Sequence, residues 1–251
     1  MDLNGKVAFV TGGSGDIGKS IALALAGAGT DVVVSYVADA GRADTSVEAI
    51  RKAGRQGHAV HLDQRDPRSI DTCVEQVIRH FGRVDILVNN AAWNIGIPFR
   101  DLDAMTSDIW DRVLETNLRG PFLLCRALAP ELRRHKAGRI VNIASLAGLA
   151  PAGSSIAYAA SKSGLIHLTH CLAVALAPDV TVNCIAPGLV EGTRMAGRLP
   201  EEVAQSARSQ AVLGRTGSAD DIAQMTVAYC LADSMTGQTV VVDGGAASGM
   251  R

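Results

Sequence analysis

Apolar residues along the chain fall into two alternating patterns. Short runs rich in Val and Ile are typical of buried strands, and they alternate with longer stretches in which apolar residues recur every three or four positions, as in helices. Seven such strands separated by six helical stretches predict an α/β fold with a doubly wound, parallel, seven-stranded sheet and helices on both faces. The predicted strands cover residues 6–11, 31–36, 58–62, 84–90, 139–144, 180–186 and 239–243.

Composition supports one folding unit. The chain has 251 residues, of which 47% are hydrophobic and 26 are glycine, and no linker, repeat or low-complexity tract divides it. We therefore expect a single domain over residues 1–251. The formal net charge of −1 gives no reason to expect nucleic acid or an anionic membrane as a partner. Because the sequence shows neither a leader pattern nor an apolar run of about 18 residues, we expect a cytoplasmic protein.

The cysteines and histidines show no metal-ligand spacing. All the cysteines are isolated within apolar periodic segments, so we expect buried thiols and neither disulfides nor zinc ligands. His167 and His170 are three positions apart on one helical stretch, but no third ligand accompanies them, and packing is the simpler interpretation. No metal site is predicted. The cysteines are Cys73, Cys125, Cys171, Cys184 and Cys230.

The first predicted strand runs directly into a glycine-rich turn, TGGSGDIG, which an amphipathic helix follows. In Rossmann-like folds this is where a dinucleotide places its pyrophosphate, because the first amides and the positive dipole end of the helix stabilise an anion. Gly12 and Gly18 fit close backbone approach and helix packing. Asp16 lies in the first turn of the helix, where a carboxylate repels pyrophosphate unless its side chain points away, and Lys19 is a candidate to offset that charge.

Ser145, Tyr158 and Lys162 form a second candidate site. Tyr158 and Lys162 are four residues apart at the start of an apolar stretch, 158–177, that predicts a helix buried on most sides. Positions i and i+4 share a helix face, so both side chains enter one pocket. A nearby ammonium favours the phenolate, which lowers the pKa of Tyr158 toward working pH. Ser145 follows the strand at 139–144, at the sheet edge where ligands bind, and can donate to a substrate oxygen. This set predicts proton transfer coupled to hydride transfer.

In this order, the motifs resemble those of the short-chain dehydrogenase/reductase family over nearly the whole chain. The resemblance implies an NAD(P)-dependent oxidoreductase that interconverts a ketone and a secondary alcohol. It implies that Tyr158 is the general acid/base, that Lys162 lowers the Tyr158 pKa and binds the nicotinamide ribose, and that Ser145 donates to the substrate. The matching segments are TGGSGDIG, NNAA at 89–92, Asn117 in ETNLRG, Ser145, YAASK at 158–162, Pro187-Gly188 and VDGG near residue 243.

Asn117 completes this catalytic set by the same resemblance, which implies that it holds a water in a proton relay to Lys162. A polar helix residue bonded near a kink is a compatible interpretation, because Gly120 and Pro121 follow at once.

A further group of residues is expected to bind the dinucleotide. The resemblance implies that Asn89 ties neighbouring strands together beneath the cofactor and that Asp63 bonds the adenine, although a strand-end turn explains Asp63 equally well. The expected cofactor contacts are Gly12, Ser14, Gly15, Asp16, Ile17, Gly18, Ser35, Tyr36, Asp63, Asn89, Ala91, Tyr158, Lys162, Pro187, Gly188, Val190 and Thr193.

Two positions depart from the family pattern. Asp16 stands where the family has the middle glycine of the turn, and Gly15 precedes it. The segment Pro187-Gly-Leu-Val-Glu-Gly-Thr193 is one residue longer than the usual Pro-Gly-x-Val-x-Thr. Thr193 is the residue expected to hold the nicotinamide end of the cofactor, and it follows one residue later than the family pattern places its threonine.

The end of the second strand bears on the choice between NAD and NADP. An acid there pairs with the ribose 2′-hydroxyl of NAD and repels a 2′-phosphate, but this strand ends in Ser35-Tyr36. The basic residue that NADP users often carry before the middle glycine is also absent, because Gly15 is there. Arg42, in the following loop, is a candidate partner for a 2′-phosphate. We expect NADP, with NAD as the alternative.

Substrate specificity is expected in a mobile lid over residues 189–215, which carry Gly, Pro and charge without clean periodicity. The chain looks most like the 3-oxoacyl-acyl-carrier-protein reductase branch, but sugar, polyol and other secondary-alcohol dehydrogenases share its motifs. A dinucleotide-binding regulator without turnover is the non-enzyme alternative, and the presence of both Tyr158 and Lys162 speaks against it. The apolar helices suggest subunit packing, and the resemblance implies a homotetramer or homodimer. The expected pocket walls are Trp93, Asn94, Leu146, Ser155 and Met195.

Overall fold

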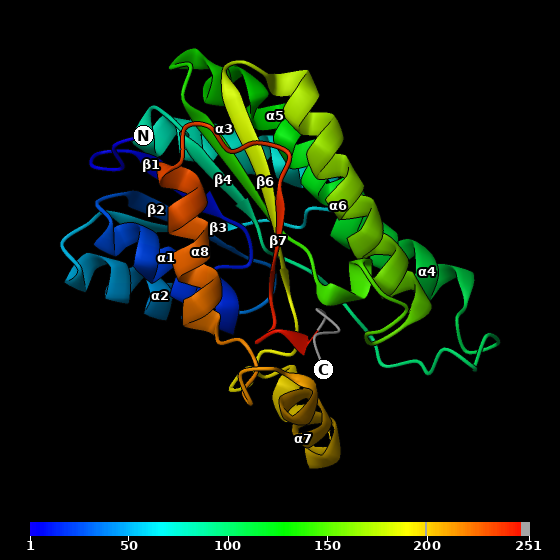
Figure 1. Cartoon of the computed structure of the whole chain (residues 1–251). Coiled ribbons are helices and arrows are strands. Elements are labelled where there is room, and N and C mark those ends of the chain that lie inside the picture. Colours follow the sequence, from blue (N-terminus) through cyan, green and yellow to red (C-terminus); the bar gives the residue numbers. More distant parts are fainter. Residues whose placement is uncertain (199, 247–251) are drawn as a thin grey trace.

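The strands of the computed structural model form one parallel sheet. Within residues 1–198 and 200–246, which the structure describes, this sheet has seven strands in the order β3-β2-β1-β4-β5-β6-β7 (Figure 1). The predicted α/β class and the parallel seven-stranded sheet are confirmed. The strands are β1 Val7–Val10, β2 Asp31–Tyr36, β3 Gly57–His61, β4 Ile86–Asn89, β5 Gly138–Ile143, β6 Val180–Pro187 and β7 Thr239–Val242.

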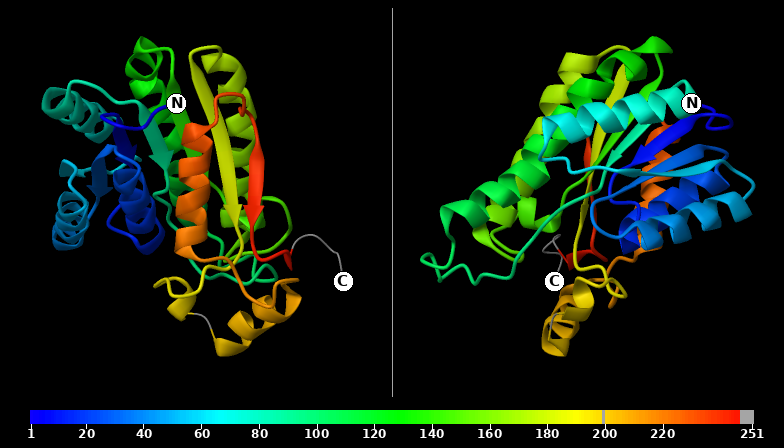
Figure 2. Two further views of the ribbon diagram at one scale, coloured as in Figure 1. Left: turned by 60° about the vertical axis from the view of Figure 1, so that its left-hand side comes forward. Right: turned by 180° about the vertical axis from the view of Figure 1, so that it is seen from behind.

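Successive residues of each strand enter different cores, because side chains alternate across a sheet. Ala8 and Val10 of β1 pack in one core with α1, α2 and α8, whereas Val7 and Phe9 pack in the other with α3, α5 and α6. Figure 2 shows these two helical layers on opposite sides of the sheet. The helices are α1 Asp16–Gly27, α2 Ala40–Lys52, α3 Pro67–Phe81, α5 Gly120–Arg134, α6 Ile156–Leu176 and α8 Ala219–Leu231.

The position of β1 determines where a ligand can bind. It pairs with β2 on one side and β4 on the other, so the chain reverses its direction of winding between β1 and β4. In open α/β sheets this switch point leaves a crevice at the carboxyl ends of the strands. Those ends face the edge of the molecule at which α7 Glu201–Gln210 lies (Figure 1).

The predicted lid, residues 189–215, contains a helix that the sequence pattern did not indicate. After a short 3-10 turn, η3 Ala196–Arg198, the chain forms α7 Glu201–Gln210. No residue of α7 is buried. A helix that buries no face needs no apolar periodicity, which is why the pattern missed it.

One cysteine prediction is wrong. Cys73, Cys125, Cys184 and Cys230 are buried free thiols as expected, but Cys171 is exposed. The reason is that α6 is less enclosed than its apolar sequence indicated: one of its faces reaches the surface, where Val174 is 81% exposed.

In the part of the chain that the structure describes, no helix is long and apolar enough to cross a membrane. The same residues contain no cluster of three or more His, Cys, Asp or Glu side chains that could hold a metal ion.

Candidate active site

Tyr158 and Lys162 enter the protein interior from the first turns of α6. The helix begins where the Ser155 hydroxyl accepts a hydrogen bond from the Tyr158 backbone N–H (3.2 Å), an N-cap that fixes the start of the helix. Tyr158 is 8% and Lys162 3% exposed. Lys162 Nζ donates to the Ile143 carbonyl (2.8 Å) and lies 5.6 Å from the centre of the Tyr158 ring. The two groups therefore share one buried pocket, as their spacing predicts.

Ser145 lies at the carboxyl end of β5 and faces this pocket. It precedes the 3-10 turn η2 Leu146–Gly148, and its hydroxyl accepts from the Ala147 N–H (3.2 Å). The Ser145 side chain also forms a hydrogen bond with the Tyr158 side chain. A hydroxyl and a phenol therefore point to the same space, where both can contact one substrate oxygen.

Burial dominates the protonation of the site. It raises the pKa of the Tyr158 phenol above its ordinary value, and the hydrogen bond with Ser145 lowers it only partly. Burial also lowers the pKa of the Lys162 ammonium to about 8. The predicted lowering of the Tyr158 pKa does not appear in this structure, because burial raises the pKa and the Lys162 ammonium donates to the Ile143 carbonyl. At neutral pH Tyr158 is a proton donor beside a cation.

Asn117 lies in a widened helical turn. The chain follows α4 Ser107–Leu114 with a π-helical turn, η1 Glu115–Arg119, before α5 begins. The Asn117 Oδ1 accepts from the Trp93 N–H (2.8 Å), and its Nδ2 donates to the Trp93 carbonyl (2.9 Å) and to Ser161 Oγ (3.2 Å). Pro121, which has no N–H to donate, follows directly and favours the irregular turn. Asn117 and Lys162 therefore approach from different helices, with their bonds made to different groups.

The glycine-rich turn has the geometry that a dinucleotide requires. Gly12 has a φ of 63°, a left-handed conformation that favours glycine. At Gly18 an added Cβ would lie 2.4 Å from the Gly12 carbonyl oxygen, so only glycine lets the helix approach the turn. Gly15 precedes the first residue of α1, and no side chain caps that helix. The turn thus directs uncapped helix amides toward the crevice, which suits a pyrophosphate.

Other expected contacts support the turn from below. The Ser35 hydroxyl is 2% exposed and accepts from the Gly12 N–H (3.0 Å), so it braces the turn from β2. Ala91 donates its N–H to Thr11 Oγ1 (3.0 Å). Asn89 Nδ2 donates to Asn142 Oδ1 (2.8 Å), which joins β4 to β5.

The remaining expected contacts lie around the crevice. Asp63 is paired with Arg65 (2.6 Å), whose guanidinium holds the pKa of that carboxyl below its usual value. Tyr36 meets His61 edge-on at 5.9 Å between ring centres. The Thr193 hydroxyl donates to the Val190 carbonyl (2.8 Å) and so closes a turn of the loop itself. Ser14 in the turn and Ile17 in α1 are half-buried; Pro187 ends β6, and Gly188 follows it.

Asp16 turns away from its own helix. Its Oδ1 accepts from Arg42 Nη2 (3.1 Å), and its Oδ2 accepts from the Arg194 backbone N–H (2.7 Å). Burial opposes ionisation of Asp16, but these two bonds outweigh it and hold the pKa below its ordinary value. The charge of Asp16 is therefore offset by Arg42 and Arg194, and not by the expected Lys19.

The expected pocket walls divide into two groups. Trp93 packs against the apolar cluster that contains Tyr158, and the Arg112 guanidinium lies 4.2 Å above its ring. Asn94, next to Trp93, and Leu146, next to Ser145, are half-buried. Met195 is exposed on the loop after β6. Ser155 differs from the prediction: it is 0% exposed and its hydroxyl caps α6, so it positions Tyr158 and does not line a pocket.

Several residues that hold the site together were not predicted from the sequence. Gln64 is buried and donates its amide to the Ala91 (3.1 Å) and Thr116 (2.6 Å) carbonyls, which joins the crevice to the π-turn. Thr11 and Ser161 were visible only as members of TGGSGDIG and YAASK. Nothing in the local sequence marks Gln64, because its partners are distant along the chain.

Comparison with known proteins agrees with this geometry. The model of the short chain dehydrogenase family matches residues 6–204. The chain belongs to the short-chain dehydrogenase family. It is accordingly an NAD(P)-dependent oxidoreductase that acts on CH–OH and C=O groups.

Members of the short-chain dehydrogenase family with related sequences include a 3-oxoacyl-[acyl-carrier-protein] reductase of Staphylococcus aureus, 37% identical over 96% of this chain and 97% of that protein. Among solved structures, a short chain dehydrogenase from Burkholderia cenocepacia in complex with NADP is similar at a TM-score of 0.90 and 35% identity, with 98% of this chain and 99% of that one covered. An NAD+-bound xylitol dehydrogenase is similar at a TM-score of 0.91 and 30% identity, with 98% and 100% covered.

Proposed function

We propose that this enzyme reduces the ketone of a 3-oxoacyl thioester with NADPH. The observation that carries the proposal is the convergence of Tyr158, Ser145 and Lys162 in one buried pocket at the carboxyl edge of the sheet. The relationship to the 3-oxoacyl-[acyl-carrier-protein] reductase of Staphylococcus aureus supports this substrate class. The similarity to a xylitol dehydrogenase makes a polyol dehydrogenase the second candidate.

The residues of the pocket divide the work of reduction among them. A bound nicotinamide dinucleotide supplies a hydride to the carbonyl carbon. Ser145 donates a hydrogen bond to the carbonyl oxygen as negative charge develops there. Tyr158, held neutral by burial, gives that oxygen its proton, and the Lys162 ammonium stabilises the phenolate that remains. In the reverse direction Tyr158 is the base.

A substrate panel tests the function. The panel compares a 3-oxoacyl thioester with simple ketones and keto sugars, each assayed with NADPH and with NADH. We expect kcat/KM to be highest for the 3-oxoacyl thioester with NADPH.

The Tyr158→Phe variant tests the mechanism. It should keep cofactor binding and lose about two to four orders of magnitude in turnover, because it removes the proton donor. Tyr229→Phe, which removes another buried phenol, is the control. A polyol oxidised faster than any thioester is reduced would favour the second candidate, and full activity of Tyr158→Phe would refute the mechanism.

The preference for NADPH is a separate part of the proposal, supported by Arg42. Its guanidinium lies beside Asp16, at the start of the helix that follows β2. The nearest carboxylate after β2 belongs to Asp39, which caps α2 through the Arg42 N–H (3.0 Å). A guanidinium close to the turn can bind a 2′-phosphate by charge-assisted hydrogen bonds.

Substitution of Arg42 tests this preference. Arg42→Ala should lower kcat/KM for NADPH by about ten- to hundredfold, since a hydrogen bond to a charged group contributes about 1.5–3 kcal/mol. The value for NADH should change little, because NADH has no 2′-phosphate. A preference of the unaltered enzyme for NADH above about tenfold would overturn the assignment.

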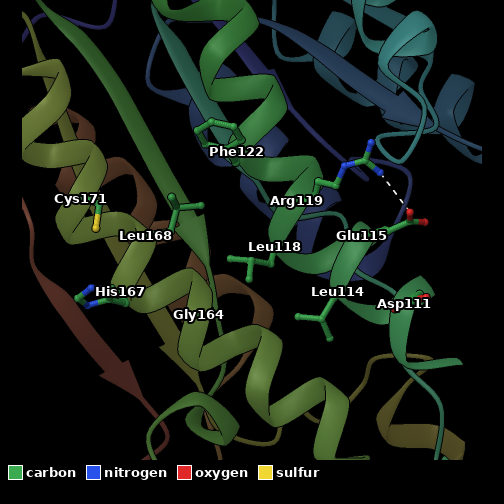
Figure 3. A pocket seen from close by; sticks show the side chains of 10 residues that line it. All are labelled: Asp111, Leu114, Glu115, Leu118, Arg119, Phe122, Gly164, His167, Leu168 and Cys171. Atoms are coloured by element: carbon green, nitrogen blue, oxygen red, sulfur yellow. Dashed lines mark hydrogen bonds and ion pairs between the residues drawn. The ribbon is translucent and has the colours of Figure 1, made fainter. Parts of the chain in front are cut away.

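We also propose that a second copy of the chain covers a groove between α6 and the continuous helical segment formed by α4, η1 and the start of α5. Figure 3 shows this groove, which has a volume of about 730 Å³, with side chains from both sides lining it. Leu118, Phe122 and Leu168 give it an apolar floor, and the Arg119–Glu115 ion pair (3.1 Å) lies at its rim. Val174 is three residues after the lining residue Cys171 on α6 and exposes a further apolar side chain, so this side of α6 is suited to a self-complementary contact between subunits.

A further inference from the structure

Asp16 joins three parts of the molecule that are far apart in the sequence. The carboxylate belongs to the first turn of α1, Arg42 to the first turns of α2, and Arg194 to the loop after β6. One oxygen of Asp16 binds the Arg42 guanidinium and the other binds the Arg194 backbone N–H, and Arg194 Nε lies 3.8 Å away. The glycine-rich turn and the predicted lid are therefore bonded to each other at this residue.

The bond to Arg194 holds a part of the loop that is itself ordered. The Thr193 hydroxyl donates to the Val190 carbonyl (2.8 Å) and accepts from the Ala196 N–H (3.2 Å), so Arg194 lies within a closed turn. On the far side of the turn, Glu191 accepts hydrogen bonds from Arg208 of α7 and from Thr216. Fixing Arg194 therefore limits the movement of the loop as far as α7.

The position of Asp16 also has a cost for nucleotide binding. A pyrophosphate at the uncapped start of α1 is an anion, and the Asp16 carboxylate in the same helical turn still repels it, although Arg42 and Arg194 offset part of its charge. Asp16 also occupies one N–H of Arg42, the group that we assign to the 2′-phosphate. The side chain is 30% exposed, so solvent weakens these effects without removing them.

We propose that Asp16 is a latch that holds the substrate loop against the nucleotide-binding turn and weakens dinucleotide binding in return. The inference rests on the proposed function only in placing the dinucleotide at the glycine-rich turn. It makes Asp16 a positioning residue whose removal has two effects of opposite sign: tighter NADPH binding and a looser loop. A side chain that merely supported the fold would weaken both when removed.

Asp16→Ala tests the latch, because alanine keeps the helix and removes both acceptors. In the protein without substrate, the Kd of NADPH measured by fluorescence should fall about three- to tenfold, as expected for one charge at a partly exposed site. Limited trypsin digestion, followed by mass spectrometry, should cut residues 191–200 at least about five times faster, since the loop loses a bond to a charged acceptor. Asp108→Ala, which removes an exposed first-turn acid from α4, should change neither value.

Two further variants separate the contacts. Asp16→Asn keeps one acceptor for the Arg194 N–H and removes the charge, so NADPH should bind more tightly while loop cleavage stays within about twofold of the unaltered protein. Arg194→Gln keeps the backbone N–H and should leave NADPH binding within about twofold.

An Asp16→Ala variant with unchanged or weaker NADPH binding, or with loop cleavage within twofold of the unaltered protein, would overturn the latch. If the unaltered protein binds neither NADPH nor NADH, the proposed function fails, and the cleavage rates alone decide whether Asp16 holds the loop.

Discussion

Lys162 places an ammonium where water does not reach it, and this has a consequence for stability. The pKa is about 8 in the folded protein against an ordinary 10.5. Below pH 8 the amino group is protonated in both the folded and the unfolded chain, and the full desolvation cost destabilises the fold. Between pH 8 and 10.5 the folded chain releases this proton first, so the unfolded chain binds more protons and stability rises with pH. The cost at neutral pH is on the order of 3 kcal/mol.

Lys162→Met tests this cost, because the variant has no group that titrates here. We compare the free energy of unfolding of the unaltered protein with that of Lys162→Met. The difference, unaltered protein minus variant, should rise by on the order of 2 kcal/mol from pH 7 to pH 9.5. Urea unfolding at the two pH values measures the difference. Lys52→Met, at an exposed position, should show no such change with pH. If the difference in the free energy of unfolding between the unaltered protein and Lys162→Met is the same at both pH values, the buried amino group does not titrate in this range.

The N-cap of α6 lies close to the proposed proton donor. The Ser155 hydroxyl caps α6 through the Tyr158 N–H (3.2 Å), and the Ser218 hydroxyl caps α8 in the same way through the Asp221 N–H (3.1 Å). The two hydroxyls accept these bonds at similar distances, although the Asp221 carboxylate also accepts from the Ser218 N–H and hydroxyl. Only the first fixes the backbone of Tyr158, the proposed proton donor, so loss of the two caps should have similar effects on stability and different effects on turnover.

Ser155→Ala and Ser218→Ala form a matched pair. Each should lose about 1 kcal/mol in the free energy of unfolding, the usual contribution of a serine N-cap. Ser155→Ala should also lower kcat by about three- to tenfold, because the Tyr158 backbone loses its anchor and the phenol its fixed position, while Ser218→Ala keeps kcat. Unfolding curves and steady-state kinetics provide the two measurements. Equal kcat values in both variants would show that the cap at Ser155 is only structural.

The sequence predicted those elements that bury an apolar face and those residues that interact with near neighbours. Most strands follow from Val- and Ile-rich runs, and Tyr158 and Lys162 meet because they are four residues apart on a helix. It could not predict α7, which buries nothing, or the exposure of Cys171, which depends on whether a neighbouring helix covers that face. Nor could it find the partners of Asp16, because Arg194 is 178 residues away along the chain.

At the scale of the whole molecule, the groove beside α6 combines an apolar lining with exposed apolar side chains. Phe122 and Cys171 line the groove of Figure 3, and Val174, three residues after Cys171 on α6, exposes a further apolar side chain. Such a patch is costly in water unless another surface covers it. The catalytic pocket lies at the opposite end of α6 from Val174, so subunit contacts made here leave the crevice open to substrate.

Val174→Glu tests this assembly. The side chain is 81% exposed, so the fold should tolerate a carboxylate, but an interface that buries it should not. We expect the mass measured by light scattering to fall to that of a smaller species. Val203→Glu, on exposed α7 and 45% exposed, should leave the mass unchanged. A monomeric unaltered protein, or an assembly that survives Val174→Glu, would argue against this contact.

The π-helical turn at Glu115–Arg119 lets one continuous helix direct its side chains differently before and after the turn. From Ser107 to Arg134 the helical backbone continues without interruption, but an i→i+5 turn contains one residue more than an α-helical turn. The side-chain rows before and after it are thus out of phase by about 100°. Asn117 can point inward to Trp93 while Phe122, one turn later, points outward. Deleting Thr116 would restore a single phase and force one of these two side chains to leave its neighbours.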